Sequence, residues 1–205
     1  MLRLRALELI QAFRHPGGAE FVLFCNDVIR AVCFAGGIPQ SQVSTCSRTD
    51  AKDGGVDTRL GAGVKGVDRF GYFGQPSVWQ FKAADESSIT EASIREEVNK
   101  QHARKCIANG DAYRLCVCAH IPDSKRQGLY AAMTSEVKAI NASAPQPKIL
   151  NIDDIAAVAN GFPALVLAFR PGLSGLCTVV AINASSTANA MKSEDHFIVS
   201  SQSSE

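Results

Sequence analysis

Strand-like and helix-like hydrophobic periodicities alternate along this chain, and this alternation is the feature that most limits its fold. Residues 113–119 form a largely apolar run that predicts a buried strand. Helical periodicity precedes this run over residues 89–108 and follows it over residues 124–141. A strand between two helices, each long enough to cover a sheet, predicts a layered α/β arrangement.

The remaining segments extend the same pattern. Helical spacing is expected over residues 2–13, 19–34 and 153–160, and strands over residues 43–47, 56–60, 78–83 and 148–151. Glu91/Arg95 and Glu96/Lys100 stand four residues apart and predict ion pairs along one continuous helix over 89–108. The resulting order, α-β-β-β-α-β-α-β-α, predicts an α/β fold with a central mixed sheet flanked by helices.

Composition places the chain among globular proteins. It has 205 residues, of which 46% are hydrophobic and 20% charged, so it can bury a core without disulfides. Beyond Pro171 the sequence is rich in Ser, Ala and Asn. We therefore expect one domain over residues 1–170 and an extension or linker toward a further domain over residues 171–205.

Cysteine usage and the first residues predict a cytoplasmic protein. The seven cysteines are odd in number and lie mostly in apolar runs, which is typical of reduced, buried thiols. Charges interrupt the first eight residues, so no signal peptide is expected, and no uncharged stretch is apolar enough to predict a membrane span. There is no CxxC motif and no P-loop motif, which argues against a zinc ribbon and against P-loop nucleotide binding.

Charge is nearly balanced over the whole chain but not along it. The net charge is +1, yet residues 149–205 carry 2 basic and 5 acidic side chains. Any attraction for a polyanion is therefore expected in the first two-thirds of the chain.

The most informative motif is Asp53-Gly-Gly-Val-Asp57, followed 23 residues later by Gln80-Phe-Lys82. Because side chains alternate along a strand, Gln80 and Lys82 are expected on one face and Trp79 and Phe81 in the core. If the strands over 56–60 and 78–83 pair as a hairpin, Asp57 meets Gln80. Carboxylate, amide and carbonyl oxygens suit Mg²⁺, and Lys82 beside it would orient or deprotonate a water for phosphodiester hydrolysis.

A turn in which the acid caps backbone amides is the alternative reading of an isolated Asp-Gly-Gly. A solvated strand face is likewise the alternative for Gln80 and Lys82 taken alone.

These residues resemble the PD-(D/E)XK nuclease superfamily, and in particular its Mrr-like restriction-endonuclease branch, whose motifs are D-G-G-[IV]-D and Q-x-K. The resemblance covers residues 19–166 and implies a restriction-endonuclease-like core of α-β-β-β-α-β order. It implies Asp57 as the metal-binding acid, Gln80 in place of a second acid, the Phe81 carbonyl as a metal ligand and Lys82 as the catalytic lysine. It also implies a supplementary glutamate from the preceding helix, for which Glu20 is the candidate.

The resemblance implies a Mg²⁺-dependent endonuclease, with Mn²⁺ as a substitute ion, that cuts double-stranded DNA as a homo-oligomer. Related domains precede a STAND-type NTPase in bacterial antiviral defence proteins, which implies an effector role ahead of an NTPase or sensor region. The alternatives are a catalytically silent nucleic-acid-binding or oligomerisation module of the same fold, and an RNA-cleaving enzyme.

The glycine-rich segment over residues 61–76 has two interpretations. It is either a simple hairpin tip, or a loop that places Lys65, Arg69 and Tyr72 against the phosphates or a groove of DNA.

Overall fold

The computed structural model describes residues 3–13, 18–45, 55–64, 66, 68 and 70–169. The described helices are α1 (Ala6–Phe13), α2 (Ala19–Ala35), α3 (Glu91–Val98), α4 (Gln101–Ala108), α5 (Asp123–Ile140), α6 (Ile152–Ala159) and α7 (Pro163–Ala168). Two short 3₁₀ helices are η1 (Gln40–Gln42) and η2 (Glu86–Ser88). The strands are β1 (Val43–Thr45), β2 (Thr58–Leu60), β3 (Ser77–Lys82), β4 (Ala112–Val117) and β5 (Lys148–Leu150).

These strands form one mixed sheet in the order β1-β2-β3-β4-β5. The pairs β1/β2 and β2/β3 are antiparallel, whereas β3/β4 and β4/β5 are parallel. The parallel part follows from the crossovers through α3 and α4 and through α5, because a parallel partner requires a long connection. The prediction of an α/β fold with a mixed sheet flanked by helices is confirmed.

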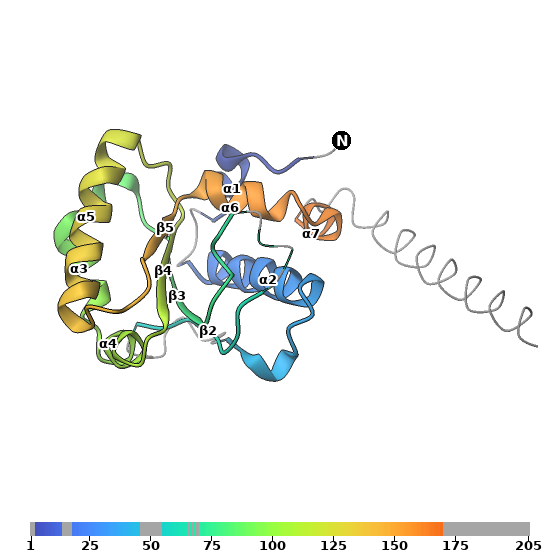
Figure 1. Ribbon diagram of the computed structural model, residues 1–205. Coiled ribbons are helices and arrows are strands. Elements are labelled where there is room, and N and C mark those ends of the chain that lie inside the picture. Colours follow the sequence, from blue (N-terminus) through green and yellow to red (C-terminus); the bar gives the residue numbers. More distant parts are fainter. Residues whose placement is uncertain are drawn as a thin grey trace, which may run out of the picture. The chain divides into compact units, whose positions relative to one another are not determined.

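Helices cover both faces of the sheet. Figure 1 shows α1, α2 and α6 on one face and α3, α4 and α5 on the other. Because both faces are covered, β3 and β4 are buried along almost their whole length. The α3/α5 face holds an aliphatic core that includes Val78, Ile94 and Val137. The α2 face is more aromatic, with Phe73 stacked on Trp79 and Phe21 edge-on to Phe81.

The prediction of one continuous helix over residues 89–108 is wrong, because the structure has two helices there, α3 and α4. The Asn99 side chain donates a hydrogen bond to the Arg95 carbonyl (2.8 Å), and Lys100 has an extended backbone (ψ 144°). A side chain that bonds a backbone carbonyl of the last turn competes with helix continuation.

The break also changes the ion pairs that the helical spacing predicts. Arg95 pairs with Glu136 of α5 (2.6 Å), and Lys100 pairs with Glu97 (2.5 Å). The structure records neither Glu91/Arg95 nor Glu96/Lys100 as an ion pair among the described residues.

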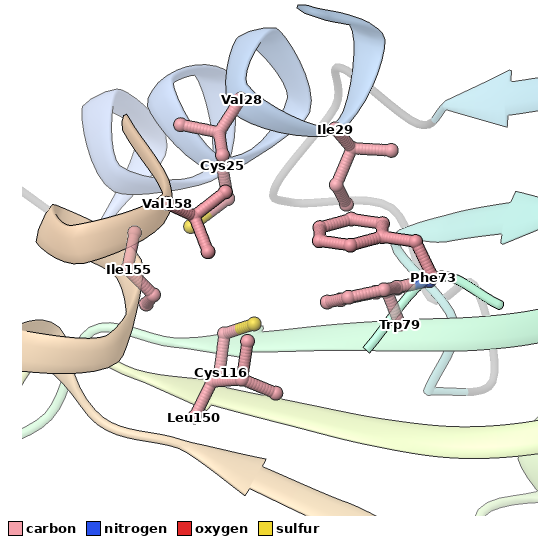
Figure 2. Close-up of a pocket in the computed structure, with 9 residues that line it drawn as sticks. All are labelled: Cys25, Val28, Ile29, Phe73, Trp79, Cys116, Leu150, Ile155 and Val158. Carbon is pink, nitrogen blue, oxygen red and sulfur yellow. The ribbon is translucent and has the colours of Figure 1, made fainter. Parts of the chain in front are cut away.

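An apolar pocket lies between α2, α6 and the sheet (Figure 2). Its lining is aliphatic, aromatic or thiol in every case: Cys25, Val28, Ile29, Phe73, Trp79, Cys116, Leu150, Ile155 and Val158. The five cysteines of the described residues are free and buried, as the sequence predicts. Cys46 and Cys177 lie outside the described residues.

The chain divides into two compact units, the first running from Arg3 to Phe162. Helix α7 belongs to the second unit. The predicted boundary near residue 170 stays a prediction, because residues 170–205 lie outside the described part of the chain. Among the described helices, none combines the length and the apolar character that a membrane crossing requires.

Candidate functional site

The pairing of β2 with β3 places Asp57 beside Gln80. Thr58 is registered with Trp79, so the preceding residue, Asp57, stands opposite Gln80. The Asp57 N–H donates to the Trp79 carbonyl (2.9 Å), and the Asp57 Oδ2 atom accepts a hydrogen bond from the Phe81 N–H (2.6 Å). The antiparallel pairing of these two segments is confirmed. It holds the Asp57 carboxylate against the backbone of β3 at Phe81. Asp53 and Gly54 lie outside the described residues.

Gln80 and Lys82 point to the same face of β3, as the alternation of side chains predicts. At Gln80 that face is not solvated, because α3 covers it and Gln80 is only 6% exposed, whereas the Lys82 side chain is 26% exposed. The Gln80 amide donates to the Glu97 carboxylate, while its oxygen accepts from the Tyr113 hydroxyl (2.7 Å). Lys82 Nζ donates to Glu97 Oε1 (3.0 Å).

Glu97 is the residue of this cluster that sequence reasoning missed. It lies in the last turn of α3 and is almost fully buried. Burial by itself would raise the pKa of Glu97, but hydrogen bonds from Lys100 and Lys82 hold that pKa below its ordinary value. The sequence does carry a signal, because Glu97 lies beside the apolar helix positions Ile94 and Val98. A carboxylate on the buried side of a helix needs partners such as these.

Lys100 joins the cluster from the break between α3 and α4. Its Nζ atom lies 2.5 Å from Glu97 Oε2, and its aliphatic stem packs against Gly55. A Cβ atom added at Gly55 would lie 2.7 Å from both Cβ and Cδ of Lys100. The glycine is therefore required there twice, once for this close approach and once for its φ of +90°.

The carboxylates of Asp57 and Glu97 both influence the pKa of the Tyr113 hydroxyl. The pKa of Tyr113 is raised well above its usual range, mainly by burial and then by the negative charges of Glu97 and Asp57. Tyr113 donates its hydroxyl hydrogen to Gln80, so it remains a neutral donor in this site. Two acids, one amide and two ammonium groups thus gather around the carboxyl end of β3.

This donor set fits a hard divalent cation. Asp57 and Glu97 would supply carboxylate oxygens, and Gln80 would supply its amide oxygen, which here accepts the Tyr113 hydroxyl. The Phe81 carbonyl points to the same side of β3 as the Trp79 carbonyl, which faces Asp57. Within the described ranges, no group of three or more His, Cys, Asp and Glu side chains is placed to hold a metal ion. A metal here would therefore depend on amide, carbonyl and water ligands besides the two carboxylates.

Glu20 is in the first turn of α2 and is exposed. The start of α2 approaches the end of β3, because a Cβ at Gly18 would lie 2.9 Å from the Ala83 Cβ. The structure thus brings Glu20 to the same end of β3 as Lys82. No hydrogen bond or ion pair joins Glu20 to another site residue in the described part of the chain, and its catalytic role stays a prediction.

The described residues of the segment over 61–76 fold back onto the protein. The Val64 N–H donates to the Phe73 carbonyl (2.8 Å), and the Tyr72 hydroxyl donates to Asp154 of α6 (3.2 Å). Burial, and then the charge of Asp154 and its hydrogen bond, raise the pKa of Tyr72 to about 12. The ring of Tyr72 stacks on exposed Phe70. Lys65 and Arg69 lie outside the described residues, so DNA contact by this loop stays a prediction.

Comparison of this chain with protein-family models, curated proteins and solved structures finds no match.

We expect Gly55→Ala to destabilise the protein more than Gly110→Ala does. Both glycines have φ near +90°, but nothing lies within 4 Å of a Cβ at Gly110, whereas a Cβ at Gly55 meets the Lys100 stem. The backbone strain should cost about 1 kcal/mol at either site, and the overlap at Gly55 should add about 1–3 kcal/mol. Urea unfolding of the two variants measures the difference. Equal losses would contradict the close packing of Gly55 on Lys100.

Proposed function

We propose that this chain is a Mg²⁺-dependent DNA endonuclease of the restriction-endonuclease-like fold. The observation that carries the proposal is the gathering of Asp57, Gln80, Glu97 and Lys82 at the carboxyl end of β3. Acid, amide and ammonium groups from three separate segments meet there, and the same residue types define the resemblance to the Mrr-like nucleases.

Each residue has a part in the proposed reaction. Asp57 and Glu97 would hold the metal, together with the Gln80 and Phe81 oxygens. The bound ion would supply charge neutralisation at the scissile phosphate and a water of lowered pKa. Lys82, whose ammonium group lies 3.0 Å from Glu97, would orient the attacking water and offset phosphate charge.

The proposed substrate is duplex DNA, and cutting both strands would require a homo-oligomer. By the motif resemblance, we further propose that the chain acts as the nuclease effector of bacterial anti-phage defence, ahead of an NTPase or sensor region. Phage plaque counts on cells that carry the intact gene, compared with a Lys82→Ala allele, test this role. Equal counts would contradict it.

The second candidate function is a catalytically silent nucleic-acid-binding or oligomerisation module. The observation that favours it is that the polar side chains of the site already bond one another. Both Glu97 oxygens bind ammonium groups, and the Gln80 amide bonds Glu97 and Tyr113. Such a closed network stabilises the fold even without a substrate.

Incubation with supercoiled plasmid separates the two functions. We expect wild-type protein to nick the plasmid with Mg²⁺ or Mn²⁺ and to stop when EDTA is added. Lys82→Ala should cut about 10²–10⁴-fold more slowly, the range for loss of a general acid-base group. Equal nicking by both proteins would indicate a contaminant, and DNA binding without cleavage by either would favour the silent module. Incubation with labelled RNA and labelled DNA side by side shows which nucleic acid the protein cleaves.

A further inference from the structure

Lys100 lies beside the proposed metal site but has no role in the reaction as proposed above. Its stem lies on Gly55, two residues before Asp57, and its ammonium group contacts Glu97. Lys100 therefore touches both segments that supply the acids of the site. Its side chain is 39% exposed, so Lys100 is accessible to solvent and to a substrate at this surface.

The charges of the cluster show why a second ammonium group matters. Lys82 and Lys100 share one carboxylate, with Lys82 on Oε1 and Lys100 on Oε2 of Glu97. Once Glu97 serves as a metal ligand, both ammonium groups need another anion nearby. A phosphodiester has two non-bridging oxygens, and the charge on them grows as water attacks.

We propose that Lys100 is a second phosphate-binding lysine, whose ammonium group moves from Glu97 to a non-bridging oxygen of the scissile phosphate. This inference rests on the proposed nuclease function. It assigns a catalytic contact to a residue outside both sequence motifs. It also makes Lys100 a competitor for a Glu97 oxygen when DNA is absent.

These two roles predict opposite effects of one substitution. Lys100→Met keeps an unbranched apolar stem to pack on Gly55 but removes the charge. We expect kcat for plasmid cleavage to fall about 10–100-fold, less than for a fully enclosed oxyanion donor because Lys100 is partly exposed. We expect Mn²⁺ to bind the DNA-free protein about 5-fold more tightly, because a cation beside Glu97 is gone.

The experiment compares wild type, Lys100→Met, Lys100→Arg and Lys105→Met. Free Mn²⁺ measured by electron paramagnetic resonance gives the metal affinity without DNA, and plasmid cleavage gives kcat and KM. Lys105 is an exposed lysine on α4 and serves as the matched control. The metal affinity, kcat and KM of Lys105→Met should stay within about twofold of wild type. Lys100→Arg, which keeps the charge, should recover part of the lost kcat.

Two results would overturn the inference while leaving the nuclease function intact. One is cleavage by Lys100→Met at the wild-type rate, and the other is a parallel loss of cleavage and Mn²⁺ affinity, which would indicate a purely structural role. Failure of the wild-type protein to cut DNA at all would instead refute the proposed function, and the inference with it.

Discussion

Glu97→Gln is expected to lower Mg²⁺-dependent DNA cleavage by about 10²–10³-fold. The carboxylate lies within hydrogen-bonding distance of Lys82, Lys100 and the Gln80 amide, and it is the second acid of the proposed metal site. Glutamine keeps the size of the side chain but removes the negative charge that a hard cation requires. Initial rates of plasmid nicking, measured across a Mg²⁺ titration, give the loss.

Glu96→Gln is the matched control, because Glu96 is the neighbouring acid on α3 and is exposed. Its cleavage rate should stay within about twofold of wild type. Glu20→Gln, assayed in parallel, measures the contribution of the acid at the start of α2. A site centred on Glu97 requires the larger loss in Glu97→Gln. Wild-type cleavage by that variant would exclude Glu97 from the reaction.

Arg114→Ala is expected to reduce the free energy of unfolding by about 3–5 kcal/mol. Arg114 is only 1% exposed, and burial lowers its pKa to about 10, so it stays charged at neutral pH. Its guanidinium donates to the backbone carbonyls of Tyr72 (3.0 Å), Tyr113 (3.1 Å) and Gln146 (3.0 Å). Alanine would remove the donor that these three carbonyls share. It would also leave a cavity beside β4.

Arg30→Ala supplies the comparison, because the Arg30 side chain is 47% exposed and pairs with Asp27 on the surface of α2. Its loss should be below about 1 kcal/mol. Arg114→Lys should be intermediate, since a single ammonium group does not reproduce the planar fork of donors. Urea unfolding followed by circular dichroism gives all three values. An equal midpoint for Arg114→Ala and Arg30→Ala would contradict the structural role of Arg114.

The strands and helices of the core were largely predictable, because their signals are local. The predicted helix over 19–34 corresponds to α2, and the strands over 78–83 and 148–151 correspond to β3 and β5. The break between α3 and α4 was not predictable from hydrophobic periodicity. It depends on the Asn99 side chain, which bonds both the Arg95 carbonyl and Glu136 of a distant helix.

The candidate site was likewise predictable only in part. The alternation of side chains along β3 predicted that Gln80 and Lys82 share a face, and the hairpin pairing placed Asp57 beside them. The sequence did not predict that this face is covered, so it did not predict the bonds from Gln80 to Glu97 and Tyr113. The sequence permits two interpretations of the loop over 61–76, and only the structure shows that the Tyr72 hydroxyl donates to Asp154 of α6.

The amino-acid order alone determined the α/β class, the mixed sheet and the spacing that brings Asp57 opposite Gln80. Such features follow from local periodicity and from the order of the elements, since strands joined by a hairpin pair antiparallel and strands joined through a helix pair parallel. Tertiary structure decided which groups complete the site. Glu97 and Lys100 reach β3 only because α3 packs against the sheet and then breaks, and packing between remote segments has no periodic signal in the sequence.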